Sequence, residues 1–458
     1  MISPEEKREK MLTDPVEQLV CQMAVPTIIT MLISALYNMA DTFFVGQLDT
    51  ISTAAVGLAL PLMNVIQAIG FFFGHGSGNY MSRMLGQGNT KAASQMADTA
   101  AVLSMSIGAV LTLLGLLNLR PLAVALGATP DLSPVLMEST VKYVSVLLLG
   151  VPFIMTSFTM NNQLRFQGNA FYGMIGMASG AVLNVILDPF FIFLLDMGVR
   201  GAAAATVVSQ AVSFFVLLKM SGRLPLRKPD FHLSGEIISS IFRFGTPSLC
   251  RQGIMSIAAV ALNHAAGGFG EAAVAAVSVV NKIIMLGGSV IIGFGQGFQP
   301  VCGFNNGAKR YDRIRKMFSF CIKASTAFMI LFGACAFAFA PGLIKFFRDD
   351  PEVISAGIPM LRFQCITAPL HGVIVMTNML VQNMGKTLQA SFLAVARQGL
   401  FFIPLVIFMT GAMGITGLQL AQSAADLLTA AVTVFFTVGA VRSLKKLENE
   451  IENKESKT

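Results

Sequence analysis

Long apolar runs recur along the whole chain, separated by short loops rich in Gly, Asn, Lys and Arg. Each run has about 20 residues or more, the length that a helix needs to cross roughly 30 Å of hydrocarbon. The runs are continuously apolar and lack the period-2 alternation of outer-membrane barrel strands. The pattern predicts twelve membrane-spanning helices, at residues 17–47, 51–79, 92–117, 139–163, 168–194, 198–220, 238–265, 271–299, 316–344, 354–382, 387–410 and 415–440.

Composition agrees with an all-α polytopic membrane protein. Of the 458 residues, 54% are hydrophobic and 12% are charged, whereas roughly a quarter are charged in an ordinary soluble domain. No segment is long or polar enough to form a separate soluble domain. The formal net charge of +8 lies mostly in loops, so it is a signal of membrane orientation and does not indicate nucleic-acid binding.

The distribution of Lys and Arg predicts the orientation, because retained positive charge marks cytoplasmic loops. With the N-terminus inside, most of these residues fall in cytoplasmic segments. The first apolar run lacks a small-residue cleavage site, so we expect it to stay in the protein. We therefore expect a multi-pass protein of the plasma (inner) membrane with both termini cytoplasmic. The opposite side then holds Arg120, Lys142, Arg200, Lys345 and Arg348.

The two halves of the chain repeat each other. Pro26 corresponds to Pro247 at an offset of 221 positions, and Gly88 corresponds to Gly307. Glycine runs of the form G-x-G-x-G, at residues 74–78 and 293–297, correspond as well, and we expect them to serve close helix packing.

Each half has an even number of spans, so the halves are parallel repeats related by an axis along the membrane normal. Two bundles around a cleft suit alternating access, although a structural scaffold could have the same shape. The predicted parts are a cytoplasmic segment at 1–16, an N-terminal six-helix bundle at 17–220, a cytoplasmic linker at 221–237, a C-terminal bundle at 238–440 and a charged tail at 441–458.

Two acids break the repeat. The counterparts of Asp41 and Asp188 are Leu262 and Ile403, and ionisable groups at membrane depth usually mark ion or substrate pathways. Asn184 precedes Asp188 by four residues and so lies on the same helix face, where its amide can donate to the carboxylate or share a cation. The alternative is that both acids lie at loop edges.

We expect four further side chains to lie near these two acids. Tyr37 has the same spacing relative to Asp41, and Thr206 in the sixth span could add a hydroxyl. Met174 and Met177 lie on the span that bears Asp188, so we place them in a deformable apolar pocket.

The C-terminal half carries Arg251, Lys282, Arg362, Arg397 and Asp426 in or near spans, together with His264 and His371. Our main interpretation is structural: the cations pair with Asp426, Glu271 or helix C-termini. The alternative is contact with substrate or an anion.

Other functional classes find no support in the motifs. Gly385-Lys386-Thr387 resembles the end of a P-loop, but the earlier glycine that the motif requires falls on Leu380, so we expect no ATP binding. No H-E-x-x-H or G-x-S-x-G sequence occurs. We expect no enzyme and no cofactor other than a coupling proton or sodium ion.

The chain resembles the multidrug and toxic compound extrusion (MATE) transporters, in their DinF-like and MepA-like branch. The resemblance covers nearly the whole chain and rests on V-P-T-I-I-T-M-L-I-S-A-L-Y-N-M-A-D-T-F-F-V-G in span 1, G-Q-G-N near Gly86, N-N-Q-L-R-F-Q-G-N from Asn161 and N-V-I-L-D-P in span 5.

The resemblance implies export of bulky, often cationic amphiphiles in exchange for protons or sodium ions, by rocking of two bundles. It implies a cation-coupling site, for a proton or a sodium ion, at Asp41, Asn184, Asp188 and Thr206. It also implies a substrate cavity lined by Tyr37, Asn38, Asn161, Met174 and Met177.

The predicted function is multidrug efflux antiport by a monomer in contact with membrane lipid. The alternative is a flippase for lipids or lipid-linked saccharides, which would use cavity Arg and Lys residues for phosphates. Arg251, Lys282 and Arg397 keep that alternative open.

Overall fold

The computed structural model describes residues 3–129, 133–222 and 230–455; within them, residues 4, 38–42 and 454–455 are described by backbone alone. The described residues form helices and no strand, which confirms the predicted all-α fold. The first half contains α1 (Pro4–Thr13), α2 (Val16–Gly46), α3 (Thr50–Gly86), α4 (Thr90–Leu117), α5 (Leu119–Ala125), α6 (Pro134–Phe166), α7 (Ala170–Pro189), the π-helix η1 (Phe190–Leu194) and α8 (Gly198–Met220). The second half contains α9 (Gly235–Gly267), α10 (Glu271–Gly307), α11 (Tyr311–Ala338), α12 (Ala340–Phe347), α13 (Pro351–Asn383), α14 (Thr387–Val395), the π-helix η2 (Ala396–Phe402), α15 (Ile403–Met413) and α16 (Ile415–Glu455).

Eleven spans in the described part of the chain are long and apolar enough to cross a membrane, one fewer than predicted. The segment that does not qualify is α9. It is 33 residues long, which suffices for a span, but Arg251, Gln252, Asn263 and His264 lower its mean hydropathy.

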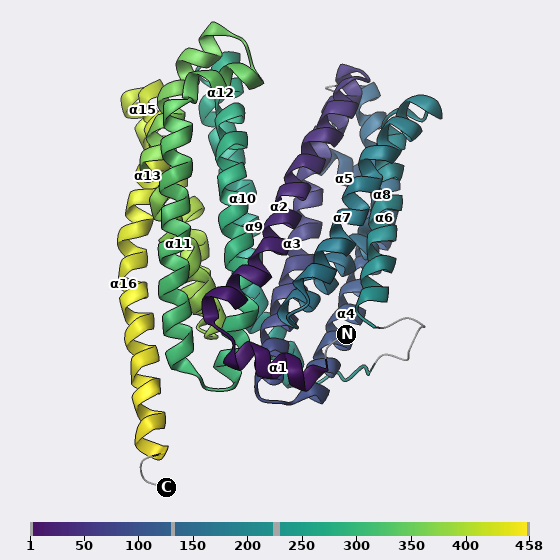
Figure 1. Ribbon diagram of the computed structural model, residues 1–458. Coiled ribbons are helices and arrows are strands. Elements are labelled where there is room, and N and C mark those ends of the chain that lie inside the picture. Colours follow the sequence, from purple (N-terminus) through teal and green to yellow (C-terminus); the bar gives the residue numbers. More distant parts are fainter. Residues whose placement is uncertain (1–2, 130–132, 223–229, 456–458) are drawn as a thin grey trace. The chain divides into compact units, whose positions relative to one another are not determined.

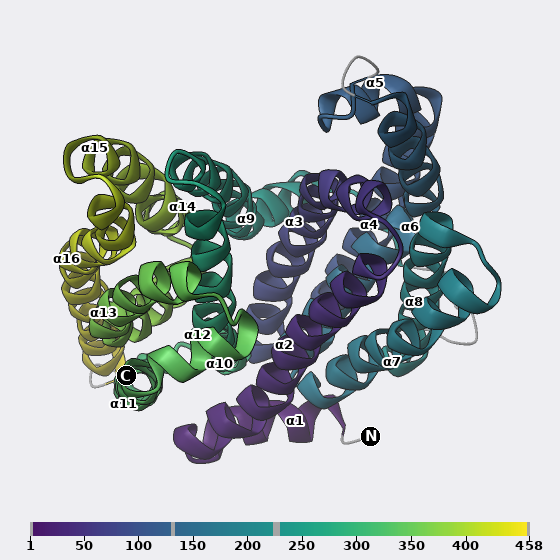
Figure 2. The ribbon, with the colours of Figure 1, turned by 90° about the horizontal axis from the view of Figure 1, so that it is seen from above.

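Contacts divide the chain into two compact units. One unit comprises residues Met1–Ile28 and Cys250–Thr458, and the other comprises Ile29–Leu249. In the first unit, α11, α13 and α16 lie side by side (Figure 1). In the second, α6, α7 and α8 lie side by side (Figure 2). We call these the C-terminal and N-terminal units.

Two long helices, α2 and α9, are each shared between the units. Residues 16–28 of α2 belong to the C-terminal unit, and residues 235–249 of α9 belong to the N-terminal unit. The divisions after Ile28 and after Leu249 are 221 positions apart, the same offset that relates Pro26 to Pro247. Each division lies two residues after its proline, where the missing N–H weakens the helix. The internal repeat is therefore present in the packing as well as in the sequence.

Glycine allows the shared helices to approach their neighbours closely. A methyl group at Gly297 of α10 would lie 2.5 Å from the Cα atom of Ala24 in α2, and one at Gly76 of α3 would lie 2.6 Å from the carbonyl oxygen of Ile241 in α9. Both distances are shorter than a carbon atom can accept. The prediction that the glycine runs serve close helix packing is confirmed.

Four long helices, α3, α6, α10 and α13, end in the same way. The residue with positive φ at each end is Gly88, Gly168, Lys309 or Gly385. The backbone N–H of the residue that follows donates to the carbonyl five positions earlier, at 2.8, 2.8, 2.8 and 3.1 Å. This is the bond that closes a Schellman motif. The counterpart of Gly88 is thus Lys309, and the predicted match to Gly307 is wrong.

Candidate functional site

The structure brings Asn184, Asp188 and Thr206 together in the N-terminal unit. Their exposed fractions are 1%, 0% and 3%. Asn184 and Asp188 lie one turn apart on α7, and the Asn184 amide donates to the Asp188 carboxylate. In the amide orientation that satisfies both of its ends, the nitrogen lies 3.0 Å from Oδ2 of Asp188 and the oxygen accepts from the Thr206 backbone N–H at 3.3 Å. In this orientation Thr206 contributes its backbone N–H, and the role of its hydroxyl stays a prediction.

The sequence around Asp188 explains its local geometry. Pro189 follows directly and has no N–H, so it cannot continue the helical ladder, and α7 ends there. The chain continues as η1, where the N–H of Leu195 donates to Phe190 five residues earlier at 3.0 Å. Single π turns inside helices are frequent at functional sites. The carboxylate is thus held at a break in the helix.

The predictions for Asn38 and Asp41 lie outside the described side chains, although their backbone belongs to α2. Tyr37, four residues before Asp41, is half-buried. Whether the two acids meet stays a prediction.

The predicted cavity residues on α6 and α7 have packing contacts. Asn161 donates to the carbonyl oxygen of Gly173 at 2.9 Å and so ties α6 to α7. Met177 packs in a cluster with Met160, Phe214 and Leu217. Met174 is half-buried. A role for these side chains in a substrate cavity stays a prediction.

The C-terminal unit contains a second buried polar cluster, formed by His371 of α13, Arg397 of η2, and Gln422 and Asp426 of α16. Arg397 Nε donates to Asp426 Oδ1 at 2.7 Å, and Gln422 donates to the same oxygen at 3.0 Å. His371 Nε2 lies 2.9 Å from Asp426 Oδ2. Asp426 is 1% exposed. The predicted pairing of the C-terminal cations with Asp426 is confirmed for Arg397.

Sequence reasoning named His371 but assigned it no partner. Asp426 and His371 are 55 positions apart, so no helical spacing connects them. The only available signal was that both are ionisable and lie in apolar spans, where unpaired charges are costly. Arg362 of the same unit packs over the ring of Phe337, 5.0 Å from its centroid.

A polyvalent metal centre finds no support in the described side chains, which contain no group of three or more His, Cys, Asp or Glu residues that could hold a metal ion. Around Asp188 the donors are hard oxygen atoms and one amide. That set suits a proton or a monovalent cation better than a transition metal.

Comparison with known proteins gives consistent matches. The family model described as MatE matches residues 26–190 and 247–408. These segments begin 221 positions apart, in agreement with the internal repeat. The chain is 27% identical over 405 residues to the multidrug export protein MepA of Staphylococcus saprophyticus, covering 86% of this chain and 87% of that protein. It is 26% identical to MepA of Staphylococcus aureus (strain NCTC 8325 / PS 47), covering 88% and 89%.

Solved structures match over most of both chains. A MATE structure in complex with MaL6 superposes with a TM-score of 0.89 at 27% identity, covering 95% of this chain and 99% of that one. A transporter of the MOP superfamily from Pyrococcus furiosus superposes with a TM-score of 0.88 at 27% identity, covering 95% and 98%. These likenesses match the predicted fold of twelve helices in two repeats.

Proposed function

Because the chain belongs to the MatE family of membrane transporters, we propose that it is a secondary active antiporter that exports amphiphilic, often cationic, compounds in exchange for protons. The observation that carries the proposal is the fully buried carboxylate of Asp188 in an apolar helix, hydrogen-bonded to Asn184. Ionisable residues inside membrane spans usually mark ion or substrate pathways. We further propose a monomer in the plasma membrane, surrounded by lipid, with both termini cytoplasmic and with no enzymatic activity or cofactor.

The orientation of Asn184 favours a proton over a sodium ion. A sodium ion at Asp188 would need oxygen ligands, but Asn184 presents its amide nitrogen to the carboxylate while its oxygen accepts from Thr206. A proton binds directly to one carboxylate oxygen and needs no further ligand.

The charge of Asp188 explains how a proton can be exchanged for a cationic substrate. An ionised Asp188 favours a cationic substrate, and protonation from the outside removes that attraction, so that substrate leaves as the proton enters. In the inward-facing state the proton dissociates and the carboxylate attracts substrate again. Asn184 holds the carboxylate in position, and Pro189 leaves it at a helix end.

The driving force for export depends on how many protons enter for each cation that leaves, so this number can be measured. One charge crossing 100 mV is worth about 2.3 kcal/mol, but this cancels when a monovalent cation leaves as one proton enters. A pH difference of one unit then supplies about 1.4 kcal/mol, or roughly tenfold accumulation. A second proton on Asp41 would restore the electrical contribution.

The flippase alternative is weakened by the structure. It relied on Arg251, Lys282 and Arg397 as phosphate ligands, and the charge of Arg397 is balanced by the buried Asp426.

The test is transport of a fluorescent lipophilic cation in proteoliposomes, under an imposed pH gradient and then a sodium gradient. We expect the pH gradient to drive transport by the natural protein and Asp188→Asn to abolish it. Asp312→Asn, at a partly exposed aspartate of α11, is the matched control and should transport normally. Normal transport by well-inserted Asp188→Asn protein would contradict the assignment. Transport driven by sodium alone would overturn the choice of ion.

A further inference from the structure

The buried cluster of the C-terminal unit contains a conflict at one atom. Nε2 of His371 lies 2.9 Å from Asp426 Oδ2, which can only accept a hydrogen bond when ionised, and 2.6 Å from Arg397 Nη2, which can only donate. If Nε2 carries a hydrogen, it donates to Asp426 and opposes Arg397. If Nε2 carries a lone pair, it accepts from Arg397 and opposes Asp426. One imidazole nitrogen cannot satisfy both neighbours.

The other buried histidine shows that this conflict is not general. His75 of α3 has Nδ1 3.1 Å from the carbonyl oxygen of Phe71, and its Nε2 is 3.3 Å from Arg165 Nη2. A neutral ring with its hydrogen on Nδ1 satisfies both contacts. One tautomer of His75 thus satisfies both of these contacts, whereas no single tautomer of His371 satisfies both of its Nε2 contacts.

Comparison of the two repeats distinguishes two kinds of contact. Contacts present in both halves serve the common fold, whereas a contact present in one half serves something else. Asn161 donates to the carbonyl oxygen of Gly173, and 217 positions later Asn378 donates to that of Ala390 at 2.7 Å. The same hydrogen bond therefore occurs in both halves, which is expected of a contact that stabilises the bundle fold they share.

The C-terminal cluster, in contrast, occurs once. The first-half counterparts of His371, Arg397 and Asp426, at the local offsets of 217, 215 and 216 positions, are Ile154, Val182 and Gln210. The first half forms its bundle with no charge at these positions. The cluster therefore breaks the repeat as Asp188 does in the other half.

We propose that His371, Arg397 and Asp426 form a proton-gated binding site for a small carboxylate-bearing molecule. With neutral His371, Arg397 and Asp426 neutralise each other and the cluster has no net charge. When the imidazole takes up one proton from water, its Nε2–H donates to Asp426 Oδ2 and becomes the counter-ion of that carboxylate. Nη2 of Arg397 then faces an N–H and loses its acceptor, while Nε of Arg397 keeps its hydrogen bond to Asp426 Oδ1.

The freed Nη2 edge of the Arg397 guanidinium is what binds the anion. The cluster now carries one positive charge, and Arg is the side chain best suited to two parallel hydrogen bonds with a carboxylate. The side chain of Arg397 is 25% exposed, while those of Asp426 and His371 are 1% and 8% exposed. Arg397 is thus the member that another molecule can reach.

The elements around His371 supply the charges that this proposal needs. Among the described residues, the charged groups that act on the imidazole are Arg397 from η2 and Asp426 from α16. Gln422 is neutral and stays bound to Asp426 Oδ1. Arg397 lies on a π-helical turn, a geometry frequent at functional sites.

The inference does not rest on the proposed antiport, and binding tests it without transport. The probes are dansyl-phenylalanine, whose carboxylate is ionised at both pH values used, and its methyl ester. Binding to the purified full chain in detergent is measured at pH 5.5 and pH 8.0. We expect the acid to bind about tenfold tighter at the lower pH, equivalent to about 1.4 kcal/mol, and the ester to show no such change.

Variants assign the effect to the cluster. His371→Gln keeps an N–H donor for Asp426 but cannot gain a charge, so it should lose the pH dependence. The double variant Arg397→Gln with Asp426→Asn removes both buried charges together, which avoids an unpaired carboxylate, and it should lose the preference for the acid over the ester. Asp312→Asn, at a partly exposed aspartate of α11, should keep both the preference and its pH dependence, and binding is measured without transport, so the outcome is distinguishable from failure of the proposed antiport.

Titration of the histidine gives an independent readout. The chain has four histidines, so ¹⁵N-histidine spectra of the natural protein and of His371→Gln assign the His371 signal. We expect this signal to change with pH over the same range as the binding of the acid probe. A His371 ring that stays neutral throughout, or acid and ester probes with the same pH dependence, would overturn the proposal.

Discussion

Lys309 occupies the same backbone position at the end of α10 that Gly88 occupies at the end of α3, with φ angles of 60° and 83°. At the two other equivalent helix ends the residue is glycine, at Gly168 and Gly385. A side chain in this left-handed region costs roughly 1–2 kcal/mol. The protein therefore carries strain at one of four otherwise equivalent helix ends.

The first prediction is that Lys309→Gly stabilises the protein. Relief of strain is partly offset by the greater freedom of glycine in the unfolded chain, so we expect a gain of about 1 kcal/mol or less. Thermal unfolding in detergent measures it. Gly88→Lys, the reverse change at the matching site, should lower the unfolding temperature. A loss of stability in Lys309→Gly would show that the lysine side chain contributes more than its backbone costs.

The second prediction concerns the hydrogen bonds by which Asn161 joins α6 to α7 and Asn378 joins α13 to α14. Asn161→Ala and Asn378→Ala each remove the side-chain donor to a buried helix carbonyl oxygen, of Gly173 or Ala390, which keeps its own helical N–H donor. We expect each to cost about 0.5–1.5 kcal/mol of stability, with similar values for the two, as measured by unfolding in denaturant. Binding of the fluorescent cation to each folded variant provides the second measurement. If Asn161→Ala weakens substrate binding and Asn378→Ala does not, Asn161 also lines the substrate cavity.

The sequence predicted the parts of the molecule that depend on local patterns. Apolar runs located the helices, and the spacing of Asn184 and Asp188 predicted their hydrogen bond. Residue identity failed at the end of α10, where it pointed to Gly307 instead of Lys309. Helix-end geometry determines that position, and Lys309 adopts a backbone conformation for which its side chain gives no signal.

Contacts between distant segments were beyond prediction. The pairing of Arg397 with Asp426 was one of several options for the C-terminal cations, and His371 was not placed with them. Which ionisable groups meet depends on how α13, η2 and α16 pack, and no period in a single helix encodes that. The sharing of α2 and α9 between units was likewise unpredicted, because a continuous apolar helix looks the same in sequence whichever bundle it packs against.

The third prediction tests the close packing of α10 on α2. A methyl group at Gly297 would meet the backbone of Ala24, which cannot move aside as a flexible side chain can. We expect Gly297→Ala to cost about 1–3 kcal/mol, the usual effect of overpacking. Gly288 of the same helix has nothing within 4 Å of such a methyl group, so Gly288→Ala should be neutral or stabilising by up to about 1 kcal/mol. Equal effects of the two variants on thermal unfolding would contradict this account.

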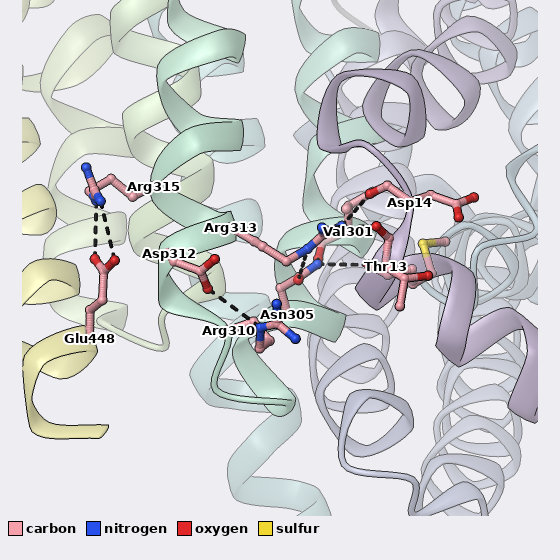
Figure 3. Close-up of polar contacts among 10 residues, drawn as sticks. Thr13, Asp14, Val301, Asn305, Arg310, Asp312, Arg313, Arg315 and Glu448 are labelled. Atoms are coloured by element: carbon pink, nitrogen blue, oxygen red, sulfur yellow. Dashed lines mark hydrogen bonds and ion pairs between the residues drawn. The ribbon is translucent and has the colours of Figure 1, made fainter. Parts of the chain in front are cut away.

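The fourth prediction concerns Arg313 and Asn305, whose side chains hydrogen-bond to the N-terminal segment (Figure 3). We call this pair the bracket. Arg313 of α11 donates through Nη2 to the carbonyl oxygen of Asp14 at 2.6 Å and through Nε to Asn305 Oδ1 at 3.0 Å. Asn305 of α10 in turn donates to the carbonyl oxygen of Met11 at 3.1 Å. These carbonyls lie where α1 ends and α2 begins, so the bracket satisfies a helix end that would otherwise lack donors.

We expect Arg313→Gln to loosen α1 without unfolding the protein. Hydrogen exchange of the amides in α1 should become about tenfold faster or more, because a hydrogen bond from a charged donor is worth about 1.5–3 kcal/mol, while amides of α13 should exchange as before. Arg310→Gln is the matched control, since Arg310 makes an exposed ion pair with Asp312 at 3.7 Å and such pairs contribute little. If exchange in α1 is unchanged in Arg313→Gln, the packing of Met11, which is 3% exposed, holds the segment. The hydrogen bonds of the bracket then add no measurable stability to α1. If exchange accelerates throughout α10 and α11 as well, the bracket stabilises the C-terminal unit as a whole, and the local role assigned to Arg313 is wrong.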